Sequence, residues 1–447
     1  MRDTLAVRPQ FDLAAEVTIP RRTIPDGSID AGTAYQLIHD ELMFDGNPRL
    51  NLATFLTTWM EPEARRLIDE TADRNLIDKD EYPQSAEIEQ RCVAILADLW
   101  HASGEPTGTS TTGSSEACML GGIALLHQWR ARGGTGRPNL VMGANVQVCW
   151  EKFCRYWDVE ARTVPVGDGA THLTPERAVA ACDERTIGVV AILGSTFDGS
   201  YEPVSDIAAA LDALESDRGI DVPVHVDAAS GGFIAPFLEP DLVWDFRLER
   251  VRSINASGHK FGLVYPGVGW AVWRAPDALP RELVFQVDYL GGQMADYGLN
   301  FSRPGAPVVA QYFNLVRLGR DGYRRLQQDC RDVASWLAEE VAQIGPYDLL
   351  SHGRELPVLA FRLRDEDVGF TVYDVSERIR THGWIVPAYR MPEGMEDVHV
   401  LRVVVRNGFS RDLAERFAQH LREITTGLQQ QGGAIRVRSG PRTGFHH

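Results

Sequence analysis

The sequence predicts an α/β protein, with a large domain built on a mainly parallel sheet and a small C-terminal α+β domain after it. From about residue 105, short and continuously apolar runs alternate with helical patterns. This alternation is typical of parallel strands that helices cover on both faces. Beyond about residue 344, two further strand patterns are each followed by a helical pattern. The 447 residues also exceed one simple core, so two or three lobes are expected.

The first 50 residues are expected to form a separate N-terminal segment. Its beginning is irregular and contains three prolines, and a helical pattern follows from Thr33 to Phe44. The large domain, residues 51–310, opens with helical patterns from Glu61 to Arg74 and from Ala86 to Trp100. The second pattern places its apolar residues on one side, as in a helix that packs against a core.

Five apolar runs are the expected strands of the large domain. They are Asn139–Met142, Ile187–Leu193, Val222–Val226, Arg252–Asn255 and Val268–Trp273. Helical patterns fall between several of these runs, as at Ser205–Ser216, which favours parallel crossover connections.

A long helical pattern from Ala306 to Ile344 closes the large domain and leads into the small domain, residues 311–429. There Val358–Leu363 and Val398–Val405 are the expected strands, with helices near 371–382 and 411–428. The tail, residues 430–447, has three arginines, four glycines, two terminal histidines and no acidic residue, so it is expected to be mobile.

Composition excludes several classes of function. The formal net charge of −17 argues against a nucleic-acid-binding protein, whose phosphate-binding surface would be basic. No apolar run approaches a membrane span, and the N-terminus lacks the apolar core of a signal peptide. The six cysteines show no CxxC pair, so they predict reduced, buried thiols of a cytoplasmic protein and neither a disulfide framework nor a metal site.

Lysine is rare in this chain: of 45 basic residues only Lys79, Lys152 and Lys260 are lysines. A lysine amine can become neutral on burial and act as a nucleophile, whereas an arginine stays protonated. Lys79 lies between two aspartates and Lys152 follows a glutamate, so structural roles are favoured for both. Lys260 lies in a run of small and polar residues, Ser253–Gly262, which favours a chemical role.

Asp227 strengthens this interpretation, because it ends an apolar strand pattern upstream of Lys260. An acid that keeps a pyridine nitrogen protonated, together with a lysine that holds an aldehyde carbon, is the pair that pyridoxal 5′-phosphate requires. Asp227 could alternatively cap the small-residue turn that follows it.

The start of a helical pattern at Gly113–Ala117 is a candidate phosphate site. Backbone N–H groups at a helix start and two serine hydroxyls can bind an anion there, although a plain serine cap is the alternative. Ser257 and His259, next to Lys260, are further candidate phosphate donors, and His259 could instead be a packed core histidine.

Two more polar residues are candidates by position alone. Gln147 precedes an aromatic helical pattern, and Thr196 follows the strand Ile187–Leu193 at the expected carboxyl edge of the sheet, where α/β sites usually lie. A purely structural role remains open for either residue.

Seven strings, in order along the chain, resemble a known family. They are Asn51–Phe55, Ile77–Gln84, Gly113–Gly122, His225–Phe233, Ser257–Gly262, Val287–Gly292 and Asn300–Pro304. Over about residues 30–428 the chain is similar to the group II pyridoxal-phosphate decarboxylases, and among them to the glutamate decarboxylases of bacterial acid resistance. The resemblance implies fold type I, pyridoxal 5′-phosphate as cofactor, and a carbon–carbon lyase that converts L-glutamate to γ-aminobutyrate and carbon dioxide and consumes a proton.

The resemblance also implies a role for each matching residue at the cofactor. Lys260 attaches the cofactor, Asp227 pairs with its pyridine nitrogen, and Gln147 and Ala229 lie on opposite faces of its ring. Thr196 lies near the ring hydroxyl. The implied phosphate ligands are Ser114, Ser115 and His259, with Ser302 contributed by a neighbouring subunit.

For the substrate, the resemblance implies that Thr54 and Phe55 bind the distal carboxylate and that Arg402 meets the α-carboxylate. Asn75 and Asp78 are implied at the entrance, across a dimer interface. The Thr54 region and Ser302 are therefore expected to serve the neighbouring subunit's site, so that the active unit is a homodimer-based assembly.

The two ends of the chain depart from the family pattern. The first 30 residues do not follow the amphipathic N-terminal helix that builds hexamers in the family, so assembly as a hexamer and recruitment to membranes in acid stay open. The tail keeps a terminal histidine, His447, and resembles the family's C-terminal plug. We expect such a plug to open when histidine is protonated in acid, and a tail with no role is the alternative.

Other functions remain to be distinguished. Within enzymes, the alternatives are a decarboxylase for aspartate or aromatic amino acids and a pyridoxal-phosphate aminotransferase. Outside catalysis, the alternatives are a silent relative, which would be expected to lack Lys260 or Asp227, and a scaffold that shares only the sheet.

Overall fold

The computed structural model describes residues 20–167, 169–287, 294–364 and 368–430. The chain divides into two compact units, residues 1–47 and 48–447, and each is described by itself. The expected mobile tail lies outside the described residues apart from Gln430, and so does most of the string Val287–Gly292. The plug and its His447 therefore stay a prediction.

The first unit contains one described helix, α1 (Ala31–Leu42), close to the expected range Thr33–Phe44. Asp30 caps it, because its side chain accepts a hydrogen bond from the backbone N–H of Thr33 at 3.0 Å. Large apolar side chains of this helix, including Tyr35 and Ile38, are exposed within the unit.

The second unit carries all the remaining described elements. Its helices are α2 (Pro62–Glu70), α3 (Pro83–Leu99), α4 (Ser114–Ala131), α5 (Val148–Tyr156), α6 (Pro175–Ala180), α7 (Val204–Arg218), α8 (Ala235–Leu238), α9 (Ala306–Ala342), α10 (Val372–Ile379) and α11 (Arg411–Gln430). Short 3₁₀ turns lie at Pro48–Leu50, Gly231–Phe233, Pro276–Ala278, Arg281–Leu283 and Arg380–His382.

A seven-stranded sheet forms the centre of the large domain. Its strands are β1 (Thr107–Thr111), β2 (Asn139–Gly143), β3 (Glu160–Val164), β4 (Thr186–Ile192), β5 (Val224–Asp227), β6 (Val251–Ala256) and β7 (Gly269–Trp273). They lie in the order β1-β7-β6-β5-β4-β2-β3. The run from β6 to β3 is parallel, and β7 is antiparallel to both β6 and β1, so the prediction of a mainly parallel sheet is confirmed.

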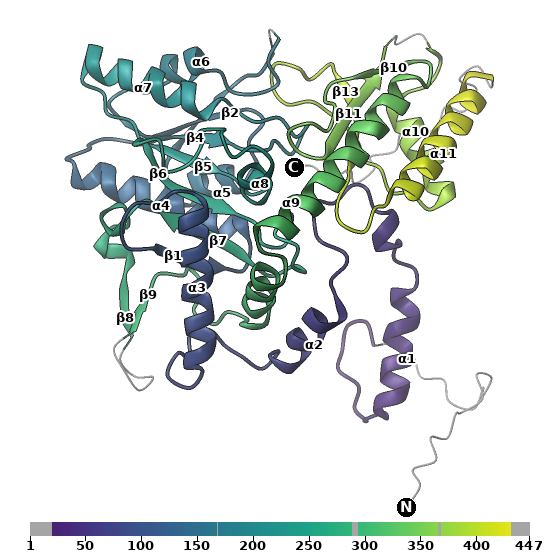
Figure 1. Ribbon diagram of the computed structural model, residues 1–447, viewed down its shortest axis with the longest axis horizontal. Helices are drawn as coiled ribbons and strands as arrows, with labels where there is room; N and C mark the ends of the chain where they lie inside the picture. The colour runs from purple at the N-terminus through teal and green to yellow at the C-terminus, as the bar shows by residue number, and fades with distance from the viewer. Residues whose placement is uncertain (1–19, 168, 288–293, 365–367, 431–447) are drawn as a thin grey trace, which may run out of the picture. The chain divides into compact units, whose positions relative to one another are not determined.

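Helices cover both faces of this sheet, as Figure 1 shows. The position of β4 between two layers of helices explains why its sequence is apolar throughout. Val189 and Ala191 face the cluster that includes α3 and α7, whereas Val190 and Ile192 face α4 and α5. A strand that is buried on both faces cannot alternate apolar with polar residues.

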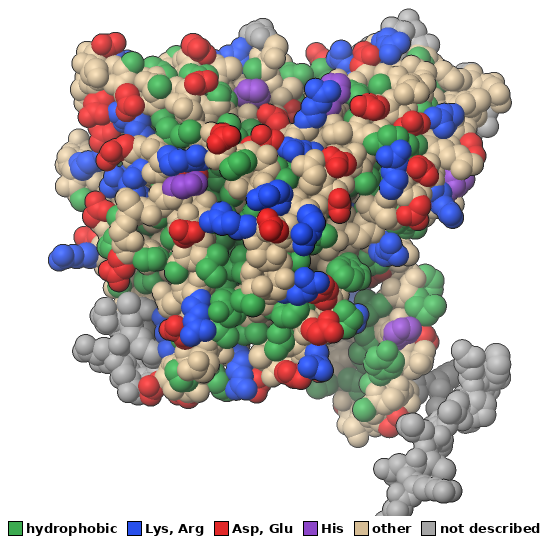
Figure 2. Space-filling view, viewed as in Figure 1, with side chains coloured by type: hydrophobic (Ala, Val, Ile, Leu, Met, Phe, Trp, Pro, Cys, Tyr) green, Lys and Arg blue, Asp and Glu red, His purple; other side chains and the backbone are tan. Residues whose placement is uncertain are grey.

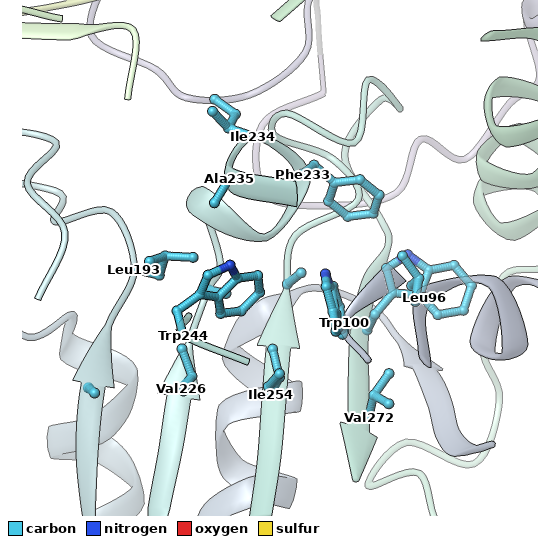
Figure 3. Packing of buried hydrophobic residues seen from close by; sticks show 14 of the residues in the cluster. Leu96, Trp100, Leu193, Val226, Phe233, Ile234, Ala235, Trp244, Ile254 and Val272 are labelled. Carbon is cyan, nitrogen blue, oxygen red and sulfur yellow. The ribbon is translucent and has the colours of Figure 1, made fainter. Parts of the chain in front are cut away.

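The core of the large domain is closed by tryptophans at the sheet ends. Figure 3 shows Trp100 and Trp244 above Val226 and Ile254, and the two indole rings meet edge to face at 6.4 Å. The indole N–H of Trp100 donates to the carbonyl of Gly232 at 3.1 Å, so its burial leaves no unpaired donor.

The small domain is built on a four-stranded antiparallel sheet in the order β10-β11-β13-β12. These strands are β10 (Tyr347–Leu349), β11 (Val358–Leu363), β12 (Ala388–Arg390) and β13 (His399–Val404). Helix α9 joins the two domains (Figure 1) and changes direction at Gly319, whose φ of 56° lies in the left-handed region that glycine tolerates. Its second part packs with α10 and α11 against this sheet.

The predicted elements agree with the structure within a few residues, but several strands were missed. Strands β1, β3, β10 and β12 lie outside the apolar runs, and β8 (Phe285–Val287) and β9 (Met294–Asp296) form a separate hairpin. The domain boundary at residues 310/311 stays a prediction, because α9 runs through it.

Acidic and basic side chains are interspersed over the face that Figure 2 presents. Among the described residues, no helix has the length and apolar character needed to cross a membrane.

Candidate active site

The carboxyl ends of the parallel strands bring the predicted site residues together. Asp227 is the last residue of β5, and Lys260 lies in the turn after the neighbouring strand β6. The loop after β4 contributes Thr196 at the same edge. Parallel strands end on one edge of a sheet, which is why residues far apart in sequence can meet there.

Asp227 is buried and surrounded by hydrogen-bond donors. Its Oδ2 accepts from the indole Nε1 of Trp150 at 2.8 Å, and its Oδ1 accepts from Asn255 Nδ2 at 2.9 Å and from the backbone N–H of Ala229 at 3.1 Å. Donors of this kind favour the ionised carboxylate. Neither Trp150 nor Asn255 was expected from the sequence to have a role. Their positions, in the first turn of α5 and at the end of β6, become informative only once the strand order is known.

Lys260 has the properties of a reactive amine. Burial lowers its pKa, and the positive charge of Arg402 adds to this effect, while the charge of Asp227 opposes it. Its Nζ donates to Ser230 Oγ at 3.3 Å and lies 5.4 Å from the ring centre of Phe55. The turn is anchored by Thr57, whose hydroxyl donates to the Lys260 carbonyl at 2.6 Å. A buried amine of lowered pKa is more easily neutral and nucleophilic.

A cradle for an anion lies beside this lysine. His259 packs against Gly113 so closely that a Cβ on Gly113 would lie 3.1 Å from the imidazole Cε1. Gly269 of β7 admits the start of α4, since a Cβ there would lie 2.6 Å from the Ser114 backbone nitrogen. Burial, and then the charge of Lys260, lowers the pKa of His259 to about 4, so the ring is neutral at pH 7.

The hydroxyl groups of the cradle come from two segments. Ser114 and Ser115 form the first turn of α4, where helix N–H groups lack helical partners. Ser257 is fully buried, and its Oγ has no hydrogen-bond partner among the residues that the structure describes. A buried hydroxyl without a partner is costly, so a ligand atom is the expected partner.

These residues fit pyridoxal 5′-phosphate. The cofactor's phosphate requires an anion cradle, its aldehyde requires an accessible amine, and its ring nitrogen requires an ionised acid. The unpartnered Ser257 hydroxyl, Lys260 and Asp227 supply these three features on one edge of the sheet.

Gln147 and Thr196 have observed contacts that are structural. The Gln147 side chain caps α5 by accepting from the backbone N–H of Cys149 at 3.0 Å, which matches the structural alternative for this residue. The Thr196 carbonyl accepts a hydrogen bond from Arg402 Nη1. Their implied contacts with a cofactor, like that of Ala229, stay predictions.

Arg402, on β13 of the small domain, reaches the edge of the large domain. Its Nη2 donates to the Ala53 carbonyl at 2.7 Å, and its guanidinium carbon lies 4.8 Å from the ring centre of Phe55. Both observed acceptors of its N–H groups, on Thr196 and Ala53, are neutral carbonyls, and among the described residues no carboxylate forms an ion pair with it. Its Nε is buried and has no hydrogen-bond partner within the described part of the chain.

Phe55 therefore lies close to both Lys260 and Arg402 of its own chain. This corrects the expectation that the Thr54 region serves the neighbouring subunit, because Phe55 contacts the lysine of the same protomer. Thr54 precedes it, and its Oγ1 accepts from the backbone N–H of Leu56 at 3.0 Å.

Asn75 and Ser302 form a second group. Asn75 Nδ2 donates to Ser302 Oγ at 3.4 Å, and Asn75 Oδ1 accepts from the Arg303 backbone N–H at 3.0 Å. Asp78 continues the same turn, since its backbone N–H donates to the Asn75 carbonyl at 3.2 Å. Within the part of the chain that the structure describes, no hydrogen bond or ion pair joins these three side chains to Lys260.

Two thiols complete the surroundings of Asp227. Atoms of Cys118, Cys149 and Asp227 lie within 4.8 Å of one another, as in a metal site. Burial raises the pKa of Cys118 well above its usual range, however, so this thiol is protonated, and its Sγ lies 3.6 Å from Asp227 Oδ2 as a weak donor. We therefore interpret this cluster as part of the hydrogen-bonded surroundings of the carboxylate and not as a metal site.

Comparisons with known proteins agree with this geometry. Residues 26–364 match the pyridoxal-dependent decarboxylase conserved domain. The chain is 52% identical over 415 residues to glutamate decarboxylase of Aliivibrio fischeri, covering 91% of this chain and 89% of that protein. It is 46% identical over 424 residues to glutamate decarboxylase beta of Listeria monocytogenes, covering 92% and 91%.

Solved structures give the same result. Glutamate decarboxylase of Lactobacillus brevis superposes with a TM-score of 0.89 at 46% identity, covering 92% of this chain and 96% of that one. Sphingosine-1-phosphate lyase of Burkholderia pseudomallei shares the fold, with a TM-score of 0.78 at 23% identity. With a lysine, an acid and an anion cradle on one sheet edge, and relatives matched along most of their length, the chain belongs to the family of pyridoxal-dependent decarboxylases that includes these glutamate decarboxylases.

Proposed function

We propose that this protein is a glutamate decarboxylase, which uses pyridoxal 5′-phosphate to convert L-glutamate to γ-aminobutyrate and carbon dioxide. Relatives that are 46% to 52% identical over about nine-tenths of the chain carry that name. In this reaction the α-carboxylate leaves as carbon dioxide and a proton takes its place on the α-carbon. Each turnover therefore consumes one proton, which suits a role in acid resistance.

The environment of Arg402 carries the proposal. A buried guanidinium without an anionic partner is unfavourable, and a carboxylate is the partner that its planar donors match. Arg402 is held by two backbone carbonyls with its face toward Phe55, whose ring also lies beside the Lys260 amine. An amino acid therefore finds a carboxylate-binding cation and the reactive lysine beside the same aromatic ring.

The chain's residues would divide the work as follows. Pyridoxal phosphate, when bound, supplies a protonated ring that withdraws electrons from the α-carbon. Asp227, whose carboxylate is oriented by three N–H donors, would hold the proton on the ring nitrogen. Ser114, Ser115, Ser257 and His259 would hold the phosphate, and Lys260 would hold the aldehyde carbon.

Orientation decides which bond breaks. Arg402 would fix the α-carboxylate, and a bond held perpendicular to the electron-withdrawing ring is the one that is activated. Phe55 is buried and packs edge to face on Phe261 at 6.4 Å, which excludes water from this side of the site. The Lys260 amine would return a proton to the α-carbon.

Thr54 would select the length of the substrate. Its Oγ1 already accepts from Leu56, so the hydroxyl hydrogen remains to donate to a distal carboxylate. Gln147 and Ala229 on the two faces of the cofactor ring, and Thr196 near its hydroxyl, complete the assignment that the family resemblance supports.

We further propose a homodimer-based assembly in the cytoplasm. Asn75, Asp78 and Ser302 carry roles in the family resemblance that their own protomer's Lys260 does not use, so a neighbouring subunit's site is the place for them. All six cysteines are buried and free, as expected in a reducing compartment.

The test is a product assay on the purified protein loaded with pyridoxal phosphate. L-glutamate labelled at carbon 1 should release labelled carbon dioxide and give γ-aminobutyrate in equal amount, and L-aspartate should be a much poorer substrate. Formation of a keto acid in place of carbon dioxide would indicate an aminotransferase. Equal turnover of aspartate or an aromatic amino acid would reassign the substrate.

A further inference from the structure

The acid at the cofactor site is the end of a chain of buried hydrogen bonds. We propose that His225, acting through Asn255 and supported by Ser253, is a positioning residue that keeps the Asp227 carboxylate oriented toward the cofactor's ring nitrogen. This inference deepens the proposed function, because it rests on pyridoxal phosphate pairing with Asp227.

Three consecutive short contacts define the chain of hydrogen bonds. Ser253 Oγ lies 2.7 Å from His225 Nδ1, and His225 Nε2 lies 2.7 Å from Asn255 Oδ1. Asn255 Nδ2 then donates to Asp227 Oδ1 at 2.9 Å. Ser253, His225 and Asn255 are all buried, on the adjacent strands β5 and β6.

The direction of every hydrogen bond follows from the charge of Asp227. An ionised carboxylate only accepts, so the Asn255 amide must present its nitrogen to Asp227 and its oxygen to His225. His225 must then carry its proton on Nε2. A neutral ring has its lone pair on Nδ1, which accepts from the Ser253 hydroxyl. Burial lowers the pKa of His225, in agreement with this neutral form.

The three N–H donors leave one acceptor position on Asp227 that only a weakly donating thiol contacts. A carboxylate has about four lone-pair positions. Asn255 and the Ala229 backbone use those of Oδ1, and Trp150 uses one on Oδ2, where the remaining neighbour is the weakly donating Cys118 thiol. The ring N–H of the cofactor would take this fourth position.

Packing holds the imidazole in place. The His225 ring meets the Trp150 ring edge to face at 4.9 Å, and a Cβ on Gly121 of α4 would lie 2.5 Å from His225 Nδ1. Gly121 lies inside helix α4, where glycine is less favourable than alanine by about 1 kcal/mol. The space for this ring explains the glycine.

The experiment compares two cofactors on the apoprotein. Pyridoxal 5′-phosphate and its 1-deaza analogue, in which carbon replaces the ring nitrogen, are titrated into wild type and variants, and the dissociation constants are measured. In wild type the analogue should bind about 10- to 100-fold more weakly, because it leaves the charged Asp227 without its ring donor.

Two mild variants carry the test. Ser253→Ala removes the donor to His225, and His225→Leu breaks the chain at its centre. In both, the ratio of the two dissociation constants should fall by several-fold, since a misoriented Asp227 distinguishes the two rings poorly. His225→Gln, which can donate to Asn255, should restore part of the ratio. With ring-¹⁵N-labelled pyridoxal phosphate, the ¹⁵N chemical shift of the ring should move toward the value of the deprotonated ring. The shift should move furthest in the variant whose ratio of dissociation constants falls most.

Trp129→Phe is the control, because its indole donates to the Glu184 carbonyl at 3.2 Å, away from Asp227. This variant should lose stability but keep the wild-type ratio. A purely structural role of His225 would weaken both cofactors by the same factor in Ser253→Ala and His225→Leu, and that result would overturn the inference. Wild-type protein that binds neither compound would overturn the proposed function and this inference with it, whereas a substrate other than glutamate would leave the ratio unchanged.

Discussion

At the scale of single residues, Lys260 is the position that the sequence identified most directly. The rarity of lysine made it conspicuous, and the structure places it where burial lowers its pKa. We predict that Lys260→Arg abolishes turnover although it keeps the charge, because a guanidinium cannot attach the aldehyde. Borohydride reduction followed by peptide mapping should label Lys260 in wild type.

The two other lysines provide the controls for this prediction. Lys79→Arg and Lys152→Arg should retain wild-type turnover, since neither residue belongs to the site. Reductive labelling of Lys79 or Lys152 in place of Lys260 would contradict the assignment.

Arg402 supports a second prediction. Arg402→Gln should lower kcat/KM for L-glutamate by about 100-fold or more, because it removes a charged pair with the substrate worth roughly 2–5 kcal/mol. Arg402→Lys should rescue little of this loss, since an ammonium cannot donate to the two backbone carbonyls and the carboxylate in one plane. Steady-state kinetics measure both effects, and a kcat/KM for Arg402→Gln within about threefold of wild type would exclude Arg402 from the substrate site.

Glu202 supports a third prediction, on stability. It is buried, and burial raises its pKa to about 7, although it accepts hydrogen bonds from Asn145 and from the backbone N–H groups of Leu173 and Ile192. The folded protein therefore takes up this proton before the unfolded chain does. The contribution of Glu202 to the free energy of unfolding should rise as pH falls from about 7 to about 4.5, by at most about 3 kcal/mol.

The measurement is chemical unfolding of apoprotein between pH 4.5 and 8, for wild type and Glu202→Gln. His259 acts in the opposite direction, because its lowered pKa of about 4 makes the unfolded chain take up the proton first as pH falls below about 6.5. The difference between the two proteins isolates Glu202. A difference that does not change with pH would show that the carboxyl titrates normally.

The site residues that could not be predicted from the sequence lack a conspicuous local context. Asp227, Lys260, Ser257 and His259 are conspicuous by type and local context, whereas Trp150 and Asn255 resemble ordinary core residues. Their role comes from meeting Asp227 across strands β5 and β6 and from helix α5, so it depends on strand order, which local pattern does not contain. Phe55 was assigned to the wrong subunit for the same reason.

At the scale of elements, replacing two helical glycines by alanine is predicted to change the stability of the protein in opposite directions. In α4, Gly121→Ala places a Cβ against the His225 ring and should destabilise the protein by about 1–3 kcal/mol. In α11, a Cβ on Gly427 would meet nothing within 4 Å, so Gly427→Ala should stabilise by about 0.5–1 kcal/mol. Thermal unfolding of both apoprotein variants is the measurement, and equal signs would contradict the packing argument.

The elements that could be predicted are those whose burial shows in composition. Strand β4 is buried on both faces and apolar throughout, so its sequence predicts it. Strand β1 is also buried but consists of threonines, a serine and a glycine, and Glu89 supplies an acceptor for Ser110 at 2.5 Å. Strand β3, at the sheet edge, is half exposed. Neither strand carries the apolar run that identifies the others.

At the scale of the whole molecule, helix α9 connects two sheets whose residues meet at one site. Its length was predictable from periodicity, and its turn at Gly319 was not, because a single glycine within a helical pattern is usually tolerated without a kink. Arg402 of the small sheet reaches Ala53 and Thr196 of the large domain. The site therefore depends on the docking of the two domains, which the separate sequence motifs do not reveal.

The assembly supports a final prediction. Asn75 and Ser302 contact each other but not the Lys260 of their own protomer, and the Ser302 side chain is exposed, so they can reach a partner. Lys260→Ala should be inactive, and the double variant Asn75→Ala with Ser302→Ala should be strongly impaired. If Asn75 and Ser302 complete the partner's site, each mixed dimer holds one site with an intact Lys260 and intact Asn75 and Ser302. Mixing after subunit exchange should therefore restore up to about a quarter of wild-type activity, because half of the dimers are mixed and each has one complete site.

The double variant mixed with Arg402→Gln is informative in the same way, since Arg402 belongs with Lys260 to the other half of the site. Activity in the mixtures that equals the sum of the separate variants, or a fully active monomer in light scattering, would place all of these residues in one protomer's site.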